Sequence, residues 1–160
     1  MSANKFKPHV HVLPEDDANR QIAVGFHNHL ALKQPRNLEI LPPASGWARA
    51  RDKLRDVHVP EMRKYPERNL VLLIDFDATA GRRAHMMAVV PADLQDRVFV
   101  LGVFSEPEKL KQALGSFEKI GGLLADECAT GAVGAWGHLL LAHNAAESTR
   151  LMARTRQILF

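Results

Sequence analysis

Residues 70–77 have the sequence LVLLIDFD, and this stretch decides the fold class. Its first five residues form a continuous apolar run of strand length, which is typical of a parallel sheet that is buried on both faces. Asp75 and Asp77 follow the run directly. We therefore expect a buried parallel strand that ends in two carboxylates at one edge of a sheet.

Three other short apolar segments predict further strands, at residues 10–13, 38–41 and 98–103. Segments with helical spacing and helix-start residues lie between and after these strands. They cover about residues 17–32, 47–55, 61–65, 81–89 and 106–114. Because strands alternate with helices, we predict an α/β fold with a mainly parallel four-stranded sheet flanked by helices, of Rossmann-like type.

The last third of the chain, residues 115–160, shows no strand pattern. Glycines at 121–122 and at 131–137 predict breaks between two or three helices, the longest over residues 137–152. We predict one domain over residues 1–160, with a core over about 9–114 and a helical C-terminal extension over about 115–160. These apolar helices either close the core or dock against a partner chain or a second copy.

The composition is that of an ordinary globular protein. The chain has 160 residues, of which 46% are hydrophobic, and a net charge of +3 with histidine neutral. Its one cysteine, Cys128, excludes an internal disulfide, and no apolar run is long enough to predict a transmembrane helix. We expect a soluble cytoplasmic protein with no membrane partner. Bases gather between residues 36 and 68, which suits either a polyanionic partner or solvated helix faces.

Three groups of carboxylates follow the first, third and fourth predicted strands. They are Glu15 with Asp16 and Asp17, Asp75 with Asp77, and Glu106 with Glu108. In a parallel sheet the carboxyl ends of the strands meet at one edge, where the ligands of such folds bind. Like charges that converge there repel each other unless a cation is present, and carboxylate oxygens suit Mg²⁺ or Mn²⁺. Helix capping is the alternative role for these acids.

Two of these segments together are similar to a known family. HVLPE, at residues 11–15, and LLIDFD, at residues 72–77, resemble the Toprim domain, the catalytic core shared by topoisomerases, primases and overcoming-lysogenization-defect nucleases. The resemblance covers about residues 10–114. The chain departs from the family at Asp16, where a glycine usually follows the glutamate, and has no counterpart of the tyrosine-bearing domain of a topoisomerase.

The Toprim resemblance implies a role for each acid. Glu15 would be a catalytic residue, as a metal ligand or general acid/base, and Asp75 and Asp77 would hold a Mg²⁺ or Mn²⁺ ion. Asp16 would assist as a metal ligand. In nuclease members of the family, two metals can activate water and stabilise the leaving oxygen of the cleaved phosphodiester. The implied activity is therefore nuclease-like, metal-dependent cleavage of DNA or RNA by a small hydrolase or by a subunit of a larger complex.

Four more residues are candidates for substrate or metal binding. Glu106 and Glu108 would either add ligands for a second metal or stabilise the first turn of a helix. Arg82 and Arg83 lie a few residues beyond the aspartates, and arginine can bind phosphate with two hydrogen bonds; plain solubility explains them equally. Family-level analogy adds an ATPase as a partner protein and phage defence as a setting.

Two other functions remain open. The sequence Glu15-Asp16-Asp17 also resembles the start of receiver domains, in which paired acids bind Mg²⁺ and an aspartate after the third strand accepts a phosphoryl group. Here that acceptor would be Asp75 or Asp77, although the Lys-Pro of the receiver family has no counterpart. The remaining alternative is a non-catalytic, partner-binding or regulatory subunit whose acidic site has decayed.

The histidines do not form a zinc motif. His9 and His11 alternate on the first predicted strand and therefore share one face of it. Neither this pair nor His27 with His29 is accompanied by the closely spaced cysteines or histidines of a strong zinc site. We expect these side chains to have packing or surface roles.

Overall fold

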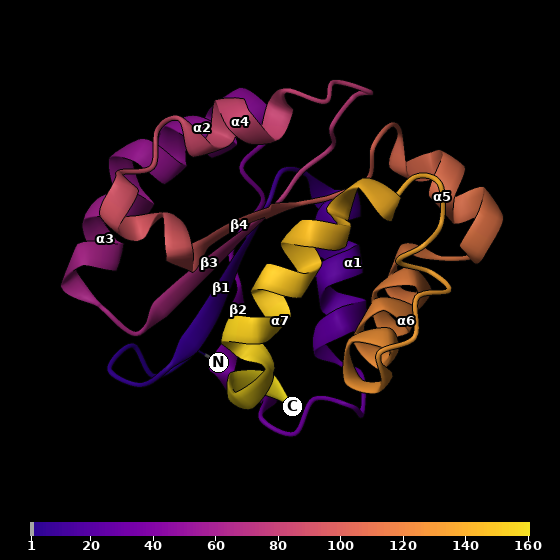
Figure 1. The fold of residues 1–160 in the computed structure, drawn as a ribbon, viewed down its shortest axis with the longest axis horizontal. Helices are drawn as coiled ribbons and strands as arrows, with labels where there is room; N and C mark the ends of the chain where they lie inside the picture. The colour runs from indigo at the N-terminus through magenta and orange to yellow at the C-terminus, as the bar shows by residue number, and fades with distance from the viewer. Residues whose placement is uncertain (1) are drawn as a thin grey trace.

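The computed structural model describes residues 2–160 and shows one parallel four-stranded sheet between two layers of helices (Figure 1). The strands are β1 (His9–Pro14), β2 (Leu38–Ile40), β3 (Arg68–Leu73) and β4 (Val98–Leu101), in the spatial order β2-β1-β3-β4. All three neighbouring pairs are parallel. The predicted fold class is confirmed, and each predicted strand is present with its ends shifted by no more than about two residues, the usual uncertainty of such boundaries.

Helices cover both faces of the sheet. They are α1 (Asp17–His27), α2 (Trp47–Lys53), α3 (Val59–Lys64), α4 (Arg82–Met87), α5 (Pro107–Leu114), α6 (Phe117–Thr130) and α7 (Ala145–Leu159). Short 3₁₀ segments lie at Pro35–Asn37, Ala92–Arg97 and Ala142–Asn144. One layer contains α2, α3 and α4, and the other contains α1, α6 and α7, with α5 beside α6 (Figure 1).

The apolar run of β3 is buried on both sides. Successive strand residues point to opposite faces. Leu70 and Leu72 pack in the core under α2, α3 and α4, whereas Val71 packs in the core under α1, α6 and α7. The continuous run in the sequence therefore reflects two hydrophobic cores that share one strand, as expected for a parallel sheet.

Glycines bring α1 and α6 into backbone contact. A Cβ atom added to Gly121 would lie 1.9 Å from the Ile22 carbonyl oxygen, and one added to Gly25 would lie 1.9 Å from the Glu118 carbonyl oxygen. Any larger residue would therefore separate the two helices. The predicted break at residues 121–122 is wrong, because α6 continues through both glycines.

The last helix begins later than the sequence pattern predicts. The helix predicted over residues 137–152 is instead α7, Ala145–Leu159. Asn144, just before it, is bound to the end of β4: its Nδ2 donates to the Gly102 carbonyl at 2.9 Å and its Oδ1 accepts from the Gly102 amide at 3.2 Å. Leu151 and Leu159 are buried in the core, so α7 closes the sheet face.

A π-helical turn, Leu54–His58, joins α2 to α3. Such turns accommodate one extra residue within an otherwise α-helical stretch. Leu54 and Met62 are both fully buried in the same core, while Val57 is 51% exposed. The predicted helices at residues 47–55 and 61–65 are thus two parts of one interrupted helical segment.

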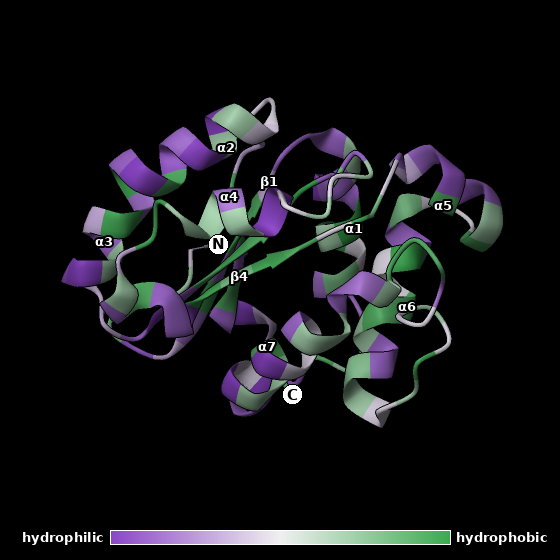
Figure 2. Cartoon of the chain, turned by 45° about the horizontal axis from the view of Figure 1, so that its top comes forward, coloured by the Kyte–Doolittle hydropathy of each residue, from purple (hydrophilic) through white to green (hydrophobic). Residues whose placement is uncertain are grey.

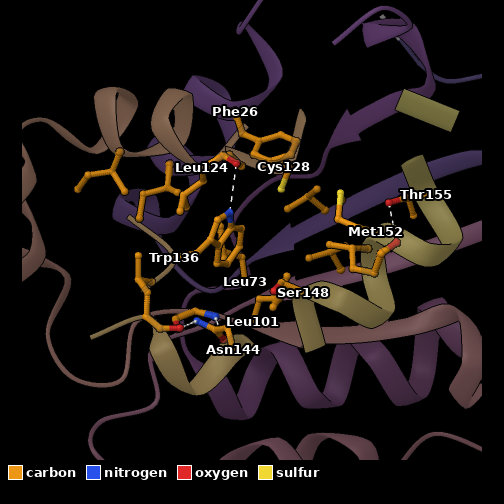
Figure 3. A pocket seen from close by; sticks show the side chains of 18 of the residues that line it. Phe26, Leu73, Leu101, Leu124, Cys128, Trp136, Asn144, Ser148, Met152 and Thr155 are labelled. Atoms are coloured by element: carbon orange, nitrogen blue, oxygen red, sulfur yellow. Dashed lines mark hydrogen bonds between the residues drawn. The ribbon is translucent and has the colours of Figure 1, made fainter. Parts of the chain in front are cut away.

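A small apolar cavity of about 80 Å³ remains between α1, α6, α7 and the sheet (Figure 3). Phe26, Leu124, Cys128, Trp136 and Met152 are among its walls, and the Trp136 indole nitrogen donates to the Leu124 carbonyl at 3.2 Å. Burial raises the pKa of the Cys128 thiol to about 11. No acidic side chain lines this cavity, so it is separate from the carboxylate clusters.

A polar cluster is buried at the amino edge of the sheet, where the strands begin. Arg68 Nε donates to His9 Nε2 at 3.0 Å, which leaves His9 Nδ1 to donate to the Lys7 carbonyl at 2.7 Å. Burial and the neighbouring Arg68 charge lower the pKa of His11 to about 3 and that of His58 to about 4. These histidines are therefore neutral, and their packing role agrees with the expectation from the sequence.

Hydrophobic residues concentrate in the strands and polar residues on the outer helices (Figure 2). Within residues 2–160, every helix is too short or too polar to cross a membrane.

Candidate acidic site at the carboxyl edge of the sheet

Glu15 and Asp75 lie side by side at the carboxyl edge of the sheet. They follow the neighbouring strands β1 and β3, and Glu15 Oε2 accepts a hydrogen bond from the Asp75 amide at 2.7 Å. The strand order reverses between β1 and β3, and ligands of open α/β sheets bind at such a switch point. The structure thus brings together two acids that are sixty residues apart in the sequence.

Asp16 and Asn19 complete a hydrogen-bonded group around Asp75. Asp16 Oδ1 caps α1 by accepting from the Asn19 amide at 3.0 Å, and it also accepts from Asn19 Nδ2 at 2.9 Å. The same Nδ2 donates to Asp75 Oδ1 at 3.0 Å. Asn19 is fully buried, and among residues 2–160 its Oδ1 has no hydrogen-bond partner. Asn19 was not predicted; the available signal was a polar side chain three residues after the helix cap.

Burial raises the pKa of both central acids. Glu15 is only 8% exposed, and its pKa is raised first by burial and then by the charges of Asp16 and Asp77, against the lowering effect of the Asp75 amide. The pKa of Asp75 is raised to about 7, mainly by burial, with Asp16, Glu15 and Asp77 adding repulsion. The site therefore holds more negative charge than its surroundings neutralise at pH 7 and above.

Asp77 is joined to this group through an arginine. Its Oδ2 accepts from Arg82 Nη1 at 2.5 Å, and the same nitrogen donates to the Asp75 carbonyl at 3.1 Å. The Arg82 side chain is buried, with its guanidinium 4.5 Å from the centre of the Trp47 ring, whereas the Asp77 side chain is 54% exposed. Arg82 thus holds Asp77 beside the buried pair.

The loops around the site are strained. Ser45, Asp77 and Ala78 have φ angles of 67°, 47° and 54°, and they are the only non-glycine residues within 2–160 with positive φ. This left-handed conformation costs roughly 1–2 kcal/mol for an L residue. Hydrogen bonds hold it here: the Ser45 amide donates to the Glu15 carbonyl at 2.8 Å, and the Ala78 amide donates to the Phe104 carbonyl at 2.6 Å. Such strain concentrates at functional sites.

Arg83 is engaged inside the protein. Its Nε donates to the Val100 carbonyl at 3.0 Å, its Nη2 donates to Asn144 Oδ1 at 3.2 Å, and its guanidinium lies 3.8 Å from the buried Glu147 carboxylate. Burial lowers the pKa of Arg83, with the Glu147 charge opposing that effect. These contacts join α4 to β4 and α7, so Arg83 has a packing role.

Glu106 and Glu108 are exposed at the start of α5. In the part of the chain that the structure describes, neither side chain makes a hydrogen bond or ion pair with Glu15 or Asp75. The first-turn position agrees with favourable placement of acids near a helix N-terminus. The observed acidic site consists of the residues after β1 and β3.

Glu15 and Asp75 are the carboxylates brought together at this edge that a Mg²⁺ or Mn²⁺ ion could use as ligands. Within residues 2–160, no three His, Cys, Asp or Glu side chains are placed to hold a metal by themselves. Mg²⁺ is often held by only one or two carboxylates together with waters and phosphate oxygens. Glu15 and Asp75 supply such carboxylates. Their pKa values are raised mainly by burial, and a bound cation would oppose that effect by favouring the charged carboxylates.

Comparison with known proteins gives no assignment. No family model matches the chain, and neither a curated protein nor a solved structure matches it.

Proposed function

We propose that this protein catalyses Mg²⁺- or Mn²⁺-dependent phosphodiester cleavage in nucleic acid, with Glu15 and Asp75 at the centre of the site. The observation that carries the proposal is that the buried Glu15 carboxylate accepts from the Asp75 amide, which places the half-buried Asp75 next to it at the switch point of the sheet. Burying acids together is unfavourable unless a cation offsets their charge. The resemblance to Toprim domains supports the same two positions.

Each residue of the site has a task in the proposed reaction. Glu15 and Asp75 would hold the ion, Asn19 orients Asp75 through its Nδ2, and Arg82 holds Asp77 at the exposed side. When bound, the ion would polarise the phosphodiester and lower the pKa of a water molecule.

A phosphoryl-acceptor function is the second candidate, and the strand order favours it. The order β2-β1-β3-β4 is that of the first four strands of flavodoxin-like folds, the class to which receiver domains belong. Asp75 follows β3, where a receiver carries its acceptor. Within residues 2–160 no fifth strand follows β4, so the site element that a receiver places there has no equivalent position in this sheet.

Cleavage assays with matched acid variants test the proposal. Labelled single-stranded DNA, duplex DNA and RNA are incubated with Mg²⁺ or Mn²⁺ and with wild type, Glu15→Gln or Asp75→Asn. We expect each variant to lose at least about 100-fold in rate, the low end for removing a catalytic acid or base. Asp17→Asn is the control, because Asp17 is exposed and bound to Arg20 and Gln21 rather than to the site. Equal rates in wild type and Asp75→Asn would overturn the proposal.

Two further measurements separate the alternatives. A ligand that binds only the folded state raises the thermal midpoint, so Mg²⁺ should stabilise wild type and not Asp75→Asn. Incubation with acetyl phosphate would label Asp75 if the protein is a phosphoryl acceptor. If wild type shows no cleavage, no labelling and no stabilisation by Mg²⁺, the non-catalytic, partner-binding function is the one that remains.

A further inference from the structure

A polyanionic substrate at the acidic edge needs cations beside it, and the two arginines nearest in the sequence do not provide them. Arg82 is bound to Asp77 and Arg83 to β4 and α7. Their guanidinium groups would have to leave these partners before they could reach a phosphate. The cations that neutralise the substrate must therefore come from another element at this edge.

Helix α2 carries three cations with no acidic partner. Across residues 2–160, no ion pair involves Arg49, Arg51 or Lys53, which we call the α2 strip. The basic residues that follow it along the chain are instead paired. Those pairs are Arg55 with Asp52 and Asp56, Arg63 with Asp93, and Lys64 with Glu61. The unpaired positive charge of this helical layer is thus confined to the helix next to the acids.

The path of α2 begins at the acidic site. Gly46, which precedes the helix, donates its amide to the Glu15 carbonyl at 3.2 Å. Arg49 and Lys53 are both exposed and lie four residues apart, so they share one face of the helix. Four residues of helix span about 6 Å, roughly the rise of two nucleotides at about 3.4 Å each. The spacing of these two cations therefore suits phosphates that lie about two nucleotides apart on one strand.

Arg51 connects this face to the site. Its guanidinium lies 5.3 Å from the centre of the Trp47 ring, and the same ring carries the Arg82 guanidinium at 4.5 Å. The Arg51 Nε is buried and has no hydrogen-bond partner within residues 2–160. Its charge is therefore held close to α2's first turn without being neutralised by an acid.

We infer that Arg49, Arg51 and Lys53 bind the phosphate backbone of the nucleic acid on which the acidic site acts. The inference rests on the proposed function for its location and on the unpaired cations of α2 for its chemistry. Contacts to phosphate fix the position of a strand but carry no base information. Binding through the strip should accordingly be independent of sequence and strongly dependent on salt.

Fluorescence anisotropy in EDTA, where metal-dependent cleavage cannot occur, measures this binding directly. The probes are a labelled single-stranded oligonucleotide and a duplex of the same sequence, at several salt concentrations. Losing three phosphate contacts on a single strand should reduce the slope of log K against log salt by about 2, which is about 100-fold in affinity at 0.1 M salt. We expect this loss in Arg49→Gln/Arg51→Gln/Lys53→Gln.

A matched triple variant controls for net charge. Lys7, Lys33 and Arg36 are exposed, have no acidic partner within residues 2–160, and precede β1 or β2 at the opposite edge. Lys7→Gln/Lys33→Gln/Arg36→Gln should bind within about threefold of wild type, since charges beyond a Debye length of about 10 Å are screened at 0.1 M salt. Because Arg51 is half-buried, Arg49→Gln/Lys53→Gln provides a second test that alters only exposed side chains.

The outcomes distinguish this inference from the proposed function. If wild type cleaves and the strip variants bind as well as wild type, the inference is overturned and the proposed function stands. If the strip variants lose binding and wild type does not cleave, the strip is supported and the proposed function fails. Wild type without measurable binding, or competition by polyglutamate as strong as by the oligonucleotide, would overturn the inference; the second result would point to an acidic protein partner.

Discussion

The carboxyl edge of the sheet buries acids with raised pKa values, whereas the amino edge buries histidines with lowered pKa values around Arg68. At the amino edge Arg68 donates to His9, lies 3.8 Å from Glu61 and stacks on Tyr65, while the buried His11 Nδ1 has no hydrogen-bond partner within residues 2–160. At the carboxyl edge Glu15 and Asp75 repel each other, and within residues 2–160 neither has an ion-pair partner, whereas Asp77 is paired with Arg82.

The difference shows what the fold itself requires. Neutral histidines complete the amino edge because they can be buried without a counter-ion. The buried charge of the amino edge, Arg68, has Glu61 beside it, so the acids without an ion-pair partner distinguish the carboxyl edge from the amino edge. The two edges should therefore respond differently to mutation and to pH.

Removing Arg68 should break the amino edge. Arg68→Ala leaves His9 Nε2 without its donor and removes a buried guanidinium, which we expect to lower the free energy of unfolding by about 3 kcal/mol. Urea unfolding measures the change, and Arg36→Ala, at an exposed position, should stay within about 0.5 kcal/mol of wild type. A loss below about 1 kcal/mol would show that the cluster does not depend on Arg68.

Neutralising Asp75 should stabilise the carboxyl edge. Asp75→Asn keeps an oxygen that can accept from Asn19 and removes the buried charge, so the free energy of unfolding at pH 8 should rise by about 2 kcal/mol, less than the full pKa shift implies because the side chain is partly solvated. The surface variant Asp17→Asn should show no such rise in the free energy of unfolding. Destabilisation by Asp75→Asn would mean that the charge is already neutralised in the folded protein.

The pH dependence of stability should have opposite signs at the two edges. The raised pKa of Asp75 makes the folded state bind a proton between about pH 4 and 7 that the unfolded state has released, so this stabilisation is lost as pH rises. The lowered pKa values of His11 and His58 keep the folded state neutral below pH 6.5, so that stability is lost as pH falls toward about 3 to 4.

Single variants separate these opposing slopes, each up to about 1.4 kcal/mol per pH unit for one group. Relative to wild type, Asp75→Asn should lose more stability on acidification from pH 6.5 to 4. His58→Asn should instead lose more stability on going from pH 4 to 7. Chemical denaturation at closely spaced pH values checks both; parallel curves for the two variants would contradict the assignment of the slopes.

The smallest effect should come from two helix caps. Asp16 caps α1 at the acidic site and Ser116 caps α6 by accepting from the Lys119 amide at 3.1 Å. Replacing either by Ala should cost about 1 kcal/mol. Only Asp16→Ala should also lower the pKa of Asp75, because it removes a neighbouring negative charge. NMR titration of the carboxyl groups distinguishes the two variants, and an unchanged Asp75 pKa in Asp16→Ala would contradict this coupling.

The strands and the meeting of Glu15 with Asp75 could be predicted from the sequence because they follow from local patterns and parallel topology. The apolar run at residues 70–74 needs no information from elsewhere in the chain. Once two parallel strands are neighbours, the acids that follow them must meet at one edge. Periodicity and chain direction were sufficient for these features.

The parts that could not be predicted depend on contacts between distant segments. From the sequence alone Gly121 predicts a helix break, and only its contact with Ile22 of α1 shows that the glycine serves helix packing instead. The start of α7 depends on Asn144 binding Gly102 at the end of β4. In the same way, the sequence cannot show that Arg83 is engaged by Asn144 while Arg49 on α2 has no acidic partner.

The π-helical turn at Leu54–His58 uncouples the rotational phases of α2 and α3. Each helical residue advances the side-chain direction by about 100°, so one additional residue lets Met62 face the core while Arg49 and Lys53 face solvent. Deleting the half-exposed Val57 would remove this additional residue. Either Met62 would then turn away from the core, or Arg49 and Lys53 would turn away from solvent. The inserted residue thus makes the direction of the α2 cations independent of the packing of α3.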